Sequence, residues 1–269
     1  CLMKSNRIDT FYFQDPNVVN LTQANYDTDK FLLKDGFRDY SSVTHIPDRA
    51  FYSANAKITL KNLNNLVSIG DRAFYNATHG GNAIEITDDN NKLKTIGANA
   101  FNSFKGRITL KNLNMLKSIG DNAFDGASNT SNVVEITDEN ALTTIGARAF
   151  QAFNGTITLQ NLNLLEKISS YAFKEFKGKI TLKNLTNITT IDEEAFNGAG
   201  TTTSVIEITG RNALTTIGTR AFLAFNGTIT LKNLTNLTKI GDSAFNLATH
   251  ADSVVEINGA HSAFNNYRC

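Results

Sequence analysis

The stretch FKGRITLKNLNMLKSIGDNAF, residues 104–124, contains the pattern that decides the fold. Ile108 and Leu110 are two residues apart, which is the strand period, so both are predicted to face the core while Thr109 faces outward. Three more apolar residues follow at intervals of three: Leu113, Leu116 and Ile119. This spacing predicts successive corners of a coil, with one apolar side chain facing the core at each corner.

The end of the same stretch predicts a short helical turn. Gly120 permits a tight backbone, and Asp121 is a residue type that caps the first turn of a helix. Such a turn would bring Ala123 and Phe124 into the core. One coil is therefore predicted to consist of an inward-facing strand and a short helical return.

The Ala-Phe pair that ends this stretch occurs nine times between residues 50 and 245. Successive Phe residues are 23, 27, 23, 26, 23, 23, 26 and 23 positions apart, and a fixed period of this size indicates a solenoid. We therefore predict a β-rich solenoid of about nine coils over residues 38–257. Residues 1–37 are predicted to be an N-terminal cap or anchor segment, and residues 258–269 a short C-terminal cap.

Two coil types alternate, because every long coil has three or four extra residues directly after the Phe. In short coils a second Phe lies three positions after the first, at Phe104, Phe153, Phe176 and Phe225. In long coils the same position is Ala77, Ala127, Ala199 or Ala248. A large side chain alternating with a small one predicts volume compensation in a stacked core, so these aromatic residues are interpreted as structural.

The charges and motifs exclude several classes of function. Lys and Arg total 26 against 25 for Asp and Glu, so the chain lacks the positive field that nucleic-acid binding requires. The sequence has no catalytic triad, phosphate loop or zinc spacing, and we expect neither an enzyme nor a cofactor or metal. Carboxylates at Asp88, Asp89, Asp138 and Glu139 hint at calcium, but the equivalent turns later in the chain lack them, which favours a turn role.

The outward strand positions form a repetitive polar face. Each strand carries one of these residues at its centre: Thr59, Glu85, Thr109, Glu135, Thr158, Thr181, Glu207, Thr230 and Glu256. On several strands the residue two positions after the central Thr is Lys, as at Lys61 and Lys111. Each such Lys is predicted to lie within ~8 Å of a Glu on the neighbouring strand. Two interpretations stay open: a solvated ladder that prevents edge pairing, or an extended surface that binds a protein or a glycan.

The candidate binding site is the part of this face where the alternation of Glu and Lys is interrupted. Two short coils follow each other there, and Gln160 replaces a Lys. The predicted binding residues are Thr109, Lys111, Glu135, Thr158, Gln160, Thr181 and Lys183.

The segments LVSIGDRAF, LKSIGDNAF and LTTIGARAF, at residues 66–74, 116–124 and 142–150, resemble the leucine-rich repeats of the BspA type. The chain departs from that pattern where family members usually have a Cys after the Phe and a Pro after the strand. The resemblance implies a surface-exposed adhesion or recognition protein of a bacterium or protozoan, with a protein or glycan of a host or neighbouring cell as partner. The alternative is a structural subunit of a cell-envelope protein assembly.

The two cysteines, Cys1 and Cys269, are at opposite ends of the chain. A nine-coil stack separates them by on the order of 40 Å, so they are not expected to form a disulfide within one chain. Cys1, followed by the polar Lys4 and Ser5, is similar to the start of a processed bacterial lipoprotein. We therefore expect a cell-surface or extracellular protein, with membrane contact only through a lipid on Cys1, unless the chain is a fragment.

Overall fold

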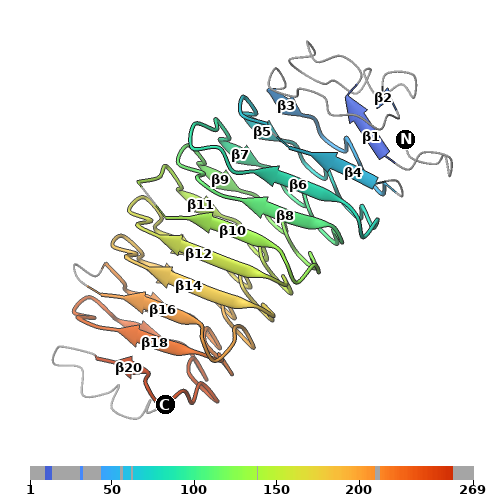
Figure 1. The fold of residues 1–269 in the computed structure, drawn as a ribbon. Helices are drawn as coiled ribbons and strands as arrows, with labels where there is room; N and C mark the ends of the chain where they lie inside the picture. Colours follow the sequence, from blue (N-terminus) through green and yellow to red (C-terminus); the bar gives the residue numbers. More distant parts are fainter. Residues whose placement is uncertain are drawn as a thin grey trace.

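A computed structural model describes residues 10–13, 31–32, 44–54, 57–61, 63–137, 139–209 and 213–256. Over these residues the chain forms an elongated solenoid in which each coil stacks on the previous one (Figure 1). The predicted solenoid of about nine coils is confirmed. The predicted short helical turns are wrong, because the described residues contain no helix.

The long strands of all coils form one eleven-stranded sheet. Its parallel part consists of β4 (Lys57–Leu60), β6 (Ala83–Ile86), β8 (Arg107–Leu110), β10 (Val133–Ile136), β12 (Thr156–Gln160), β14 (Lys179–Lys183), β16 (Val205–Ile208), β18 (Thr228–Leu231) and β20 (Val254–Val255). At the N-terminal end, β1 (Thr10–Phe13) pairs parallel with β4, and β2 (Phe31–Leu32) pairs antiparallel with β1.

Two-residue strands on the far side of each coil form two smaller parallel sheets. The first contains β3 (His45–Ile46), β5 (Ser68–Ile69), β7 (Thr95–Ile96), β9 (Ser118–Ile119) and β11 (Thr144–Ile145). The second contains β13 (Lys167–Ile168), β15 (Thr190–Ile191), β17 (Thr216–Ile217) and β19 (Lys239–Ile240). Each coil therefore contributes one long and one short strand to the walls of the solenoid.

The core lies between these walls and contains the residues that the period-2 pattern selects. In β8, Ile108 and Leu110 are buried while Arg107 is exposed, and Thr109 faces outward between the two. The corner residues Leu113 and Leu116 are also fully buried.

A column of parallel Phe rings runs through this core. Successive rings are 4.9–5.4 Å apart between centroids, as for Phe124, Phe150 and Phe173. In most short coils the second Phe packs edge-on against the column, as the ring of Phe104 does at 5.6 Å and 84° from that of Phe101. The ring of Phe176 is tilted by 51° relative to that of Phe173. Because all these rings are buried, the predicted structural role of the Phe positions is confirmed.

Backbone conformation explains why the Ala-Phe segment is not helical. Asn122 and Gly126 have positive φ angles of 54° and 66°, and a left-handed residue every four positions stops a right-handed helix. The amides of Asn122 and Phe124 donate instead to the carbonyls of Ala147 and Ala149 on the next coil, at 2.9 and 2.7 Å. The Asp121 carboxylate likewise accepts from the Ala147 amide at 2.8 Å, so it links two coils and caps no helix.

Strand register changes at each step from a short coil to a long one. Thr109 pairs with Val133, two residues before Glu135, whereas Glu135 pairs directly with Thr158 on the following short coil. At the shifted step the side chain of Asn132 accepts a hydrogen bond from the Ile108 amide at 2.8 Å, taking a position that a backbone carbonyl would otherwise fill. Thr109 and Glu135 are therefore not direct neighbours on the two strands.

Candidate functional site

All seven predicted binding residues lie on the outward face of the eleven-stranded sheet. Thr109 is on β8, Glu135 on β10, Thr158 and Gln160 on β12, and Thr181 and Lys183 on β14, while Lys111 directly follows β8. The register brings Glu135, Thr158 and Thr181 side by side and pairs Gln160 with Lys183. Thr109 is separated from this group by the register shift.

The register shift also turns the expected diagonal Lys-Glu contacts into contacts between direct neighbours. The ammonium groups of Lys61, Lys111 and Lys232 lie 3.7, 3.6 and 3.8 Å from the carboxylates of Glu85, Glu135 and Glu256. All six side chains are at least a third exposed, so each pair contributes little to stability. These pairs neutralise much of the charge on the face.

One region of the face lacks this neutralisation. The outward residues of β12 and β14 are Thr156, Thr158, Gln160, Lys179, Thr181 and Lys183, which we call the central patch. It contains two cations and no carboxylate. Within the described part of the chain, Lys183 makes no ion pair with Glu207, the residue equivalent to the partners of Lys61 and Lys111.

The opposite wall of the solenoid carries a charged cluster centred on Glu194. Its carboxylate lies 2.7 Å from the Lys174 ammonium and 3.4 Å from the Arg220 guanidinium, and it accepts a hydrogen bond from Asn197 at 3.0 Å. The hydrogen bond from Lys174 is the main reason that the pKa of Glu194 lies below its ordinary value, and the same bond raises the pKa of Lys174. Glu194 is buried, so the cluster joins three successive coils firmly.

Three further side chains, Tyr171, Arg148 and Asp125, extend this cluster toward the N-terminal end. The ring of Tyr171 lies between two cations, 4.8 Å from the Arg148 guanidinium carbon and 5.2 Å from the Lys174 ammonium. Burial raises the pKa of Asp125, an effect that the nearby Arg148 partly offsets. The sequence prediction missed this cluster, although a comparison of the residue before each Ala-Phe pair would have shown Tyr171 and Glu194 where the other coils have Arg, Asn or Ser.

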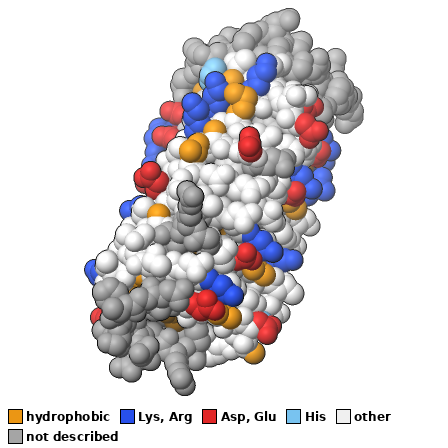
Figure 2. Space-filling model, turned by 90° about the vertical axis from the view of Figure 1, so that its left-hand side faces the viewer, with side chains coloured by type: hydrophobic (Ala, Val, Ile, Leu, Met, Phe, Trp, Pro, Cys, Tyr) orange, Lys and Arg blue, Asp and Glu red, His pale blue; other side chains and the backbone are white. Residues whose placement is uncertain are grey.

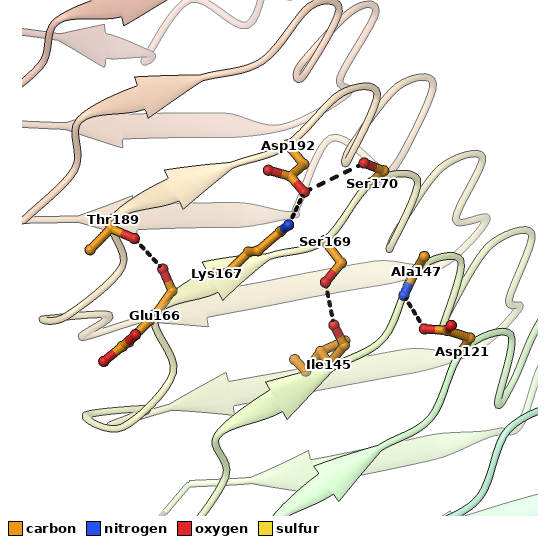
Figure 3. Close-up of polar contacts among 9 residues, drawn as sticks. All are labelled: Asp121, Ile145, Ala147, Glu166, Lys167, Ser169, Ser170, Thr189 and Asp192. Carbon is orange, nitrogen blue, oxygen red and sulfur yellow. Dashed lines mark hydrogen bonds and ion pairs between the residues drawn. The ribbon is translucent and has the colours of Figure 1, made fainter.

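A second set of polar contacts links coils beside this cluster (Figure 3). Asp192 lies 2.7 Å from the Lys167 ammonium, and the Ser169 hydroxyl donates to the Ile145 carbonyl at 2.7 Å. Thr189 donates from its hydroxyl to the Glu166 carbonyl at 2.9 Å. The two ion pairs at 2.7 Å, Lys167-Asp192 and Lys174-Glu194, both cross the step between the two successive short coils. We interpret these contacts as braces between coils.

We predict that Glu194→Gln destabilises the protein by about 1 to 3 kcal/mol at pH 7, the range for partly buried charged groups left without a partner. Because the folded state lowers the Glu194 pKa, its contribution is complete above the ordinary value of 4.5 and is lost as the pH falls through the folded value. Melting curves at several pH values should therefore show a lower melting temperature for Glu194→Gln than for the unmodified protein, and this difference should disappear in acid. Glu193→Gln, at an exposed neighbour, is the control, and an equal loss there would contradict this assignment.

No metal or membrane site is found in the part of the chain that the structure describes. Those residues contain no group of three His, Cys, Asp or Glu that could hold a metal ion, and no helix long and apolar enough to cross a membrane. Asp88 accepts the Asn90 amide at 2.8 Å, and Asp89 accepts from the Asn112 side chain at 2.6 Å. The Asp88 contact lies within its own turn and the Asp89 contact joins two neighbouring coils, while Asp138 lies outside the described residues.

Comparison with known proteins identifies the repeat. The model of the BspA type leucine rich repeat region matches residues 38–153 and 128–251, with six copies. The chain therefore belongs to the BspA-type leucine-rich repeat family. A search of curated proteins gave no match.

Among solved structures, the chain is similar to a leucine rich cell surface protein from Faecalibacterium prausnitzii A2-165. The two are 18% identical over 83% of this chain and 85% of the other, with a TM-score of 0.31. Cys1, Cys269 and the predicted C-terminal cap at 258–269 lie outside the described residues, so the lipid anchor and the unpaired cysteines stay predictions.

Proposed function

We propose that this chain is a recognition module displayed at the cell surface, which binds a protein or a glycan of another cell or its matrix through the central patch. The observation that carries the proposal is that the patch has two cations and no carboxylate on a sheet whose other charges are largely paired. Membership of the BspA-type family supports a binding role. Repeat proteins commonly bind through the extended surface that the stack presents.

The contacts of the central patch suit a flat, polar ligand. The hydroxyls of Thr158 and Thr181 lie in register on neighbouring strands and can donate or accept hydrogen bonds. Lys183 can pair with an acidic group of the ligand without first losing a carboxylate partner. Lys111 would have to give up Glu135, so we expect Lys183 to contribute more to binding.

The exposed apolar side chains favour recognition over a structural subunit docked in an envelope assembly. Within the described residues the large exposed hydrophobic side chains are Tyr52, Met115, Leu164, Leu247 and Val254. Leu247 and Val254 both follow Phe245 in the last coil, and the other three belong to three different coils. Figure 2 shows one side of the solenoid, where hydrophobic side chains are scattered among charged and neutral ones. A docking subunit would need one sizeable apolar patch.

We predict that charge reversal at Lys111 and Lys183 together weakens binding to intact cells by about tenfold or more, equivalent to 1.4 kcal/mol or more. Binding of labelled protein to cells or to a partner isolated with the purified chain would be measured. Reversal of Asp88 and Asp89, on the turn beside the sheet, is the matched control and should have little effect. Equal losses in the two variants would contradict the strand-face assignment.

A further inference from the structure

We infer that a second surface, along the edge where the long strands begin, binds a linear anionic polysaccharide. This strand-entry edge comprises the segments from the third residue after each core Phe to the first residue of the next long strand. Its Lys and Arg residues are Lys57, Lys105, Arg107, Lys177 and Lys179. Among the described residues the edge contains a single carboxylate, Asp252, in the last coil. The overall charge of +1 therefore conceals a local excess of positive charge.

These five cations are available to a ligand. Each is exposed, and none of them forms an ion pair with any of the residues that the structure describes. At the opposite ends of the same strands, Lys61 and Lys111 are paired with Glu85 and Glu135. The edge where the strands end is therefore partly neutralised by ion pairs, with Lys183 as the exception, whereas the five cations of the strand-entry edge have no such pair among the described residues.

The cations are arranged along a line. Because the strands from β4 to β20 are parallel, they all start along one edge of the sheet (Figure 1). Arg107 begins the second strand after that of Lys57, and Lys179 begins the third strand after that of Arg107. At ~4.8 Å per strand, the three positions are separated by about 10 and 14 Å. This spacing suits an extended chain with repeated negative groups better than one compact anion.

The neighbouring groups favour a carbohydrate. The long loops on the same edge present exposed hydroxyls at Thr130, Ser131, Thr202 and Thr203, which suit sugar hydroxyl groups. The Asn129 side chain donates to the Lys105 carbonyl at 3.3 Å, which places one such loop against the cations. The aromatic rings of this edge, including Phe104 and Phe176, are buried, so bases of a single-stranded nucleic acid would find no ring to stack on.

The test compares two variants with the same change in charge. Lys105→Gln, Arg107→Gln and Lys177→Gln are combined in one chain. Lys61→Gln, Lys117→Gln and Lys232→Gln, at lysines outside the edge and outside the predicted binding residues, are combined in the control. Binding of the unmodified full chain and both variants to immobilised heparin, a sulfated polysaccharide, would be measured at several salt concentrations. The edge variant should bind about tenfold more weakly, because three lost contacts at exposed sites together reach about 1.4 kcal/mol. The control should stay within about twofold of the unmodified chain, since none of its lysines lies on the strand-entry edge and Lys61 and Lys232 already face carboxylates.

Three results would overturn the inference. The first is absence of heparin binding by the unmodified chain, and the second is an equal loss in both variants, which would indicate attraction without a defined site. The third is equally tight binding of a single-stranded oligonucleotide with the same dependence on the edge cations, which would assign the edge to nucleic acid. Melting temperatures of both variants establish that folding is retained. The reversal at Lys111 and Lys183 tests the proposed binding face separately, because neither residue belongs to the strand-entry edge and no substitution in the edge variant lies in the central patch.

Discussion

Replacement of Phe150 by Ala is expected to destabilise the protein by about 3 to 5 kcal/mol, the range for removing a buried aromatic side chain. The Phe150 ring is fully buried and stacks between Phe124 at 4.9 Å and Phe173 at 5.4 Å. It also meets the edge of Phe153 at 5.7 Å. Removing it breaks the aromatic column in the middle of the chain, and in a repeat protein each coil depends on its two neighbours.

Thermal and urea unfolding of the two proteins would measure this effect. Thr158→Ala is the control, because Thr158 lies on the outward face of β12 and its side chain faces solvent and the neighbouring strands. We expect that control to change stability by less than about 0.5 kcal/mol, as surface substitutions usually do. A larger loss for Thr158→Ala than for Phe150→Ala would show that the inward and outward faces had been assigned the wrong way round.

Gly178→Ala is the second substitution with a large expected effect. A Cβ atom at this position would meet the carbonyl oxygen of Gly155 on the preceding coil, which is backbone and cannot rotate away. Gly106 is similarly restricted, because its Cβ would meet Asn82. The strand-entry segments must therefore move apart, and overpacking of this kind costs about 1 to 3 kcal/mol or more.

The matched control is Gly80→Ala, since a Cβ at Gly80 has nothing within 4 Å. Replacement there should leave stability unchanged or raise it slightly, because alanine restricts the unfolded chain. Urea midpoints of both variants would be compared with the unmodified protein. A Gly178→Ala variant as stable as Gly80→Ala would show that adjacent coils are not in close backbone contact at this edge.

Much of the candidate site follows from the sequence, because it depends only on which way each strand residue faces. The period of two in residues such as Ile108, Thr109 and Leu110 gives the faces of the sheet, and the order of coils gives the neighbours of Gln160 and Lys183. The contrast between Lys111, which is paired with Glu135, and Lys183, which is not, required the structure. Strand register is the same at both steps, since Thr109 pairs with Val133 and Thr181 pairs with Val205. The contrast therefore arises from side-chain conformation, which the sequence pattern does not specify.

The sequence by itself determined the repeat, the number of coils and the core, because the apolar spacing within each coil and the recurrence of Ala-Phe leave one way to bury those residues. Tertiary structure alone decided the rest. The backbone at Asn122 turns left-handed because its amide bonds to the next coil, so a predicted helical turn became a link between coils. The Glu194 cluster and the row of cations at the strand-entry edge likewise arise from stacking, which places residues more than 20 positions apart in the sequence side by side.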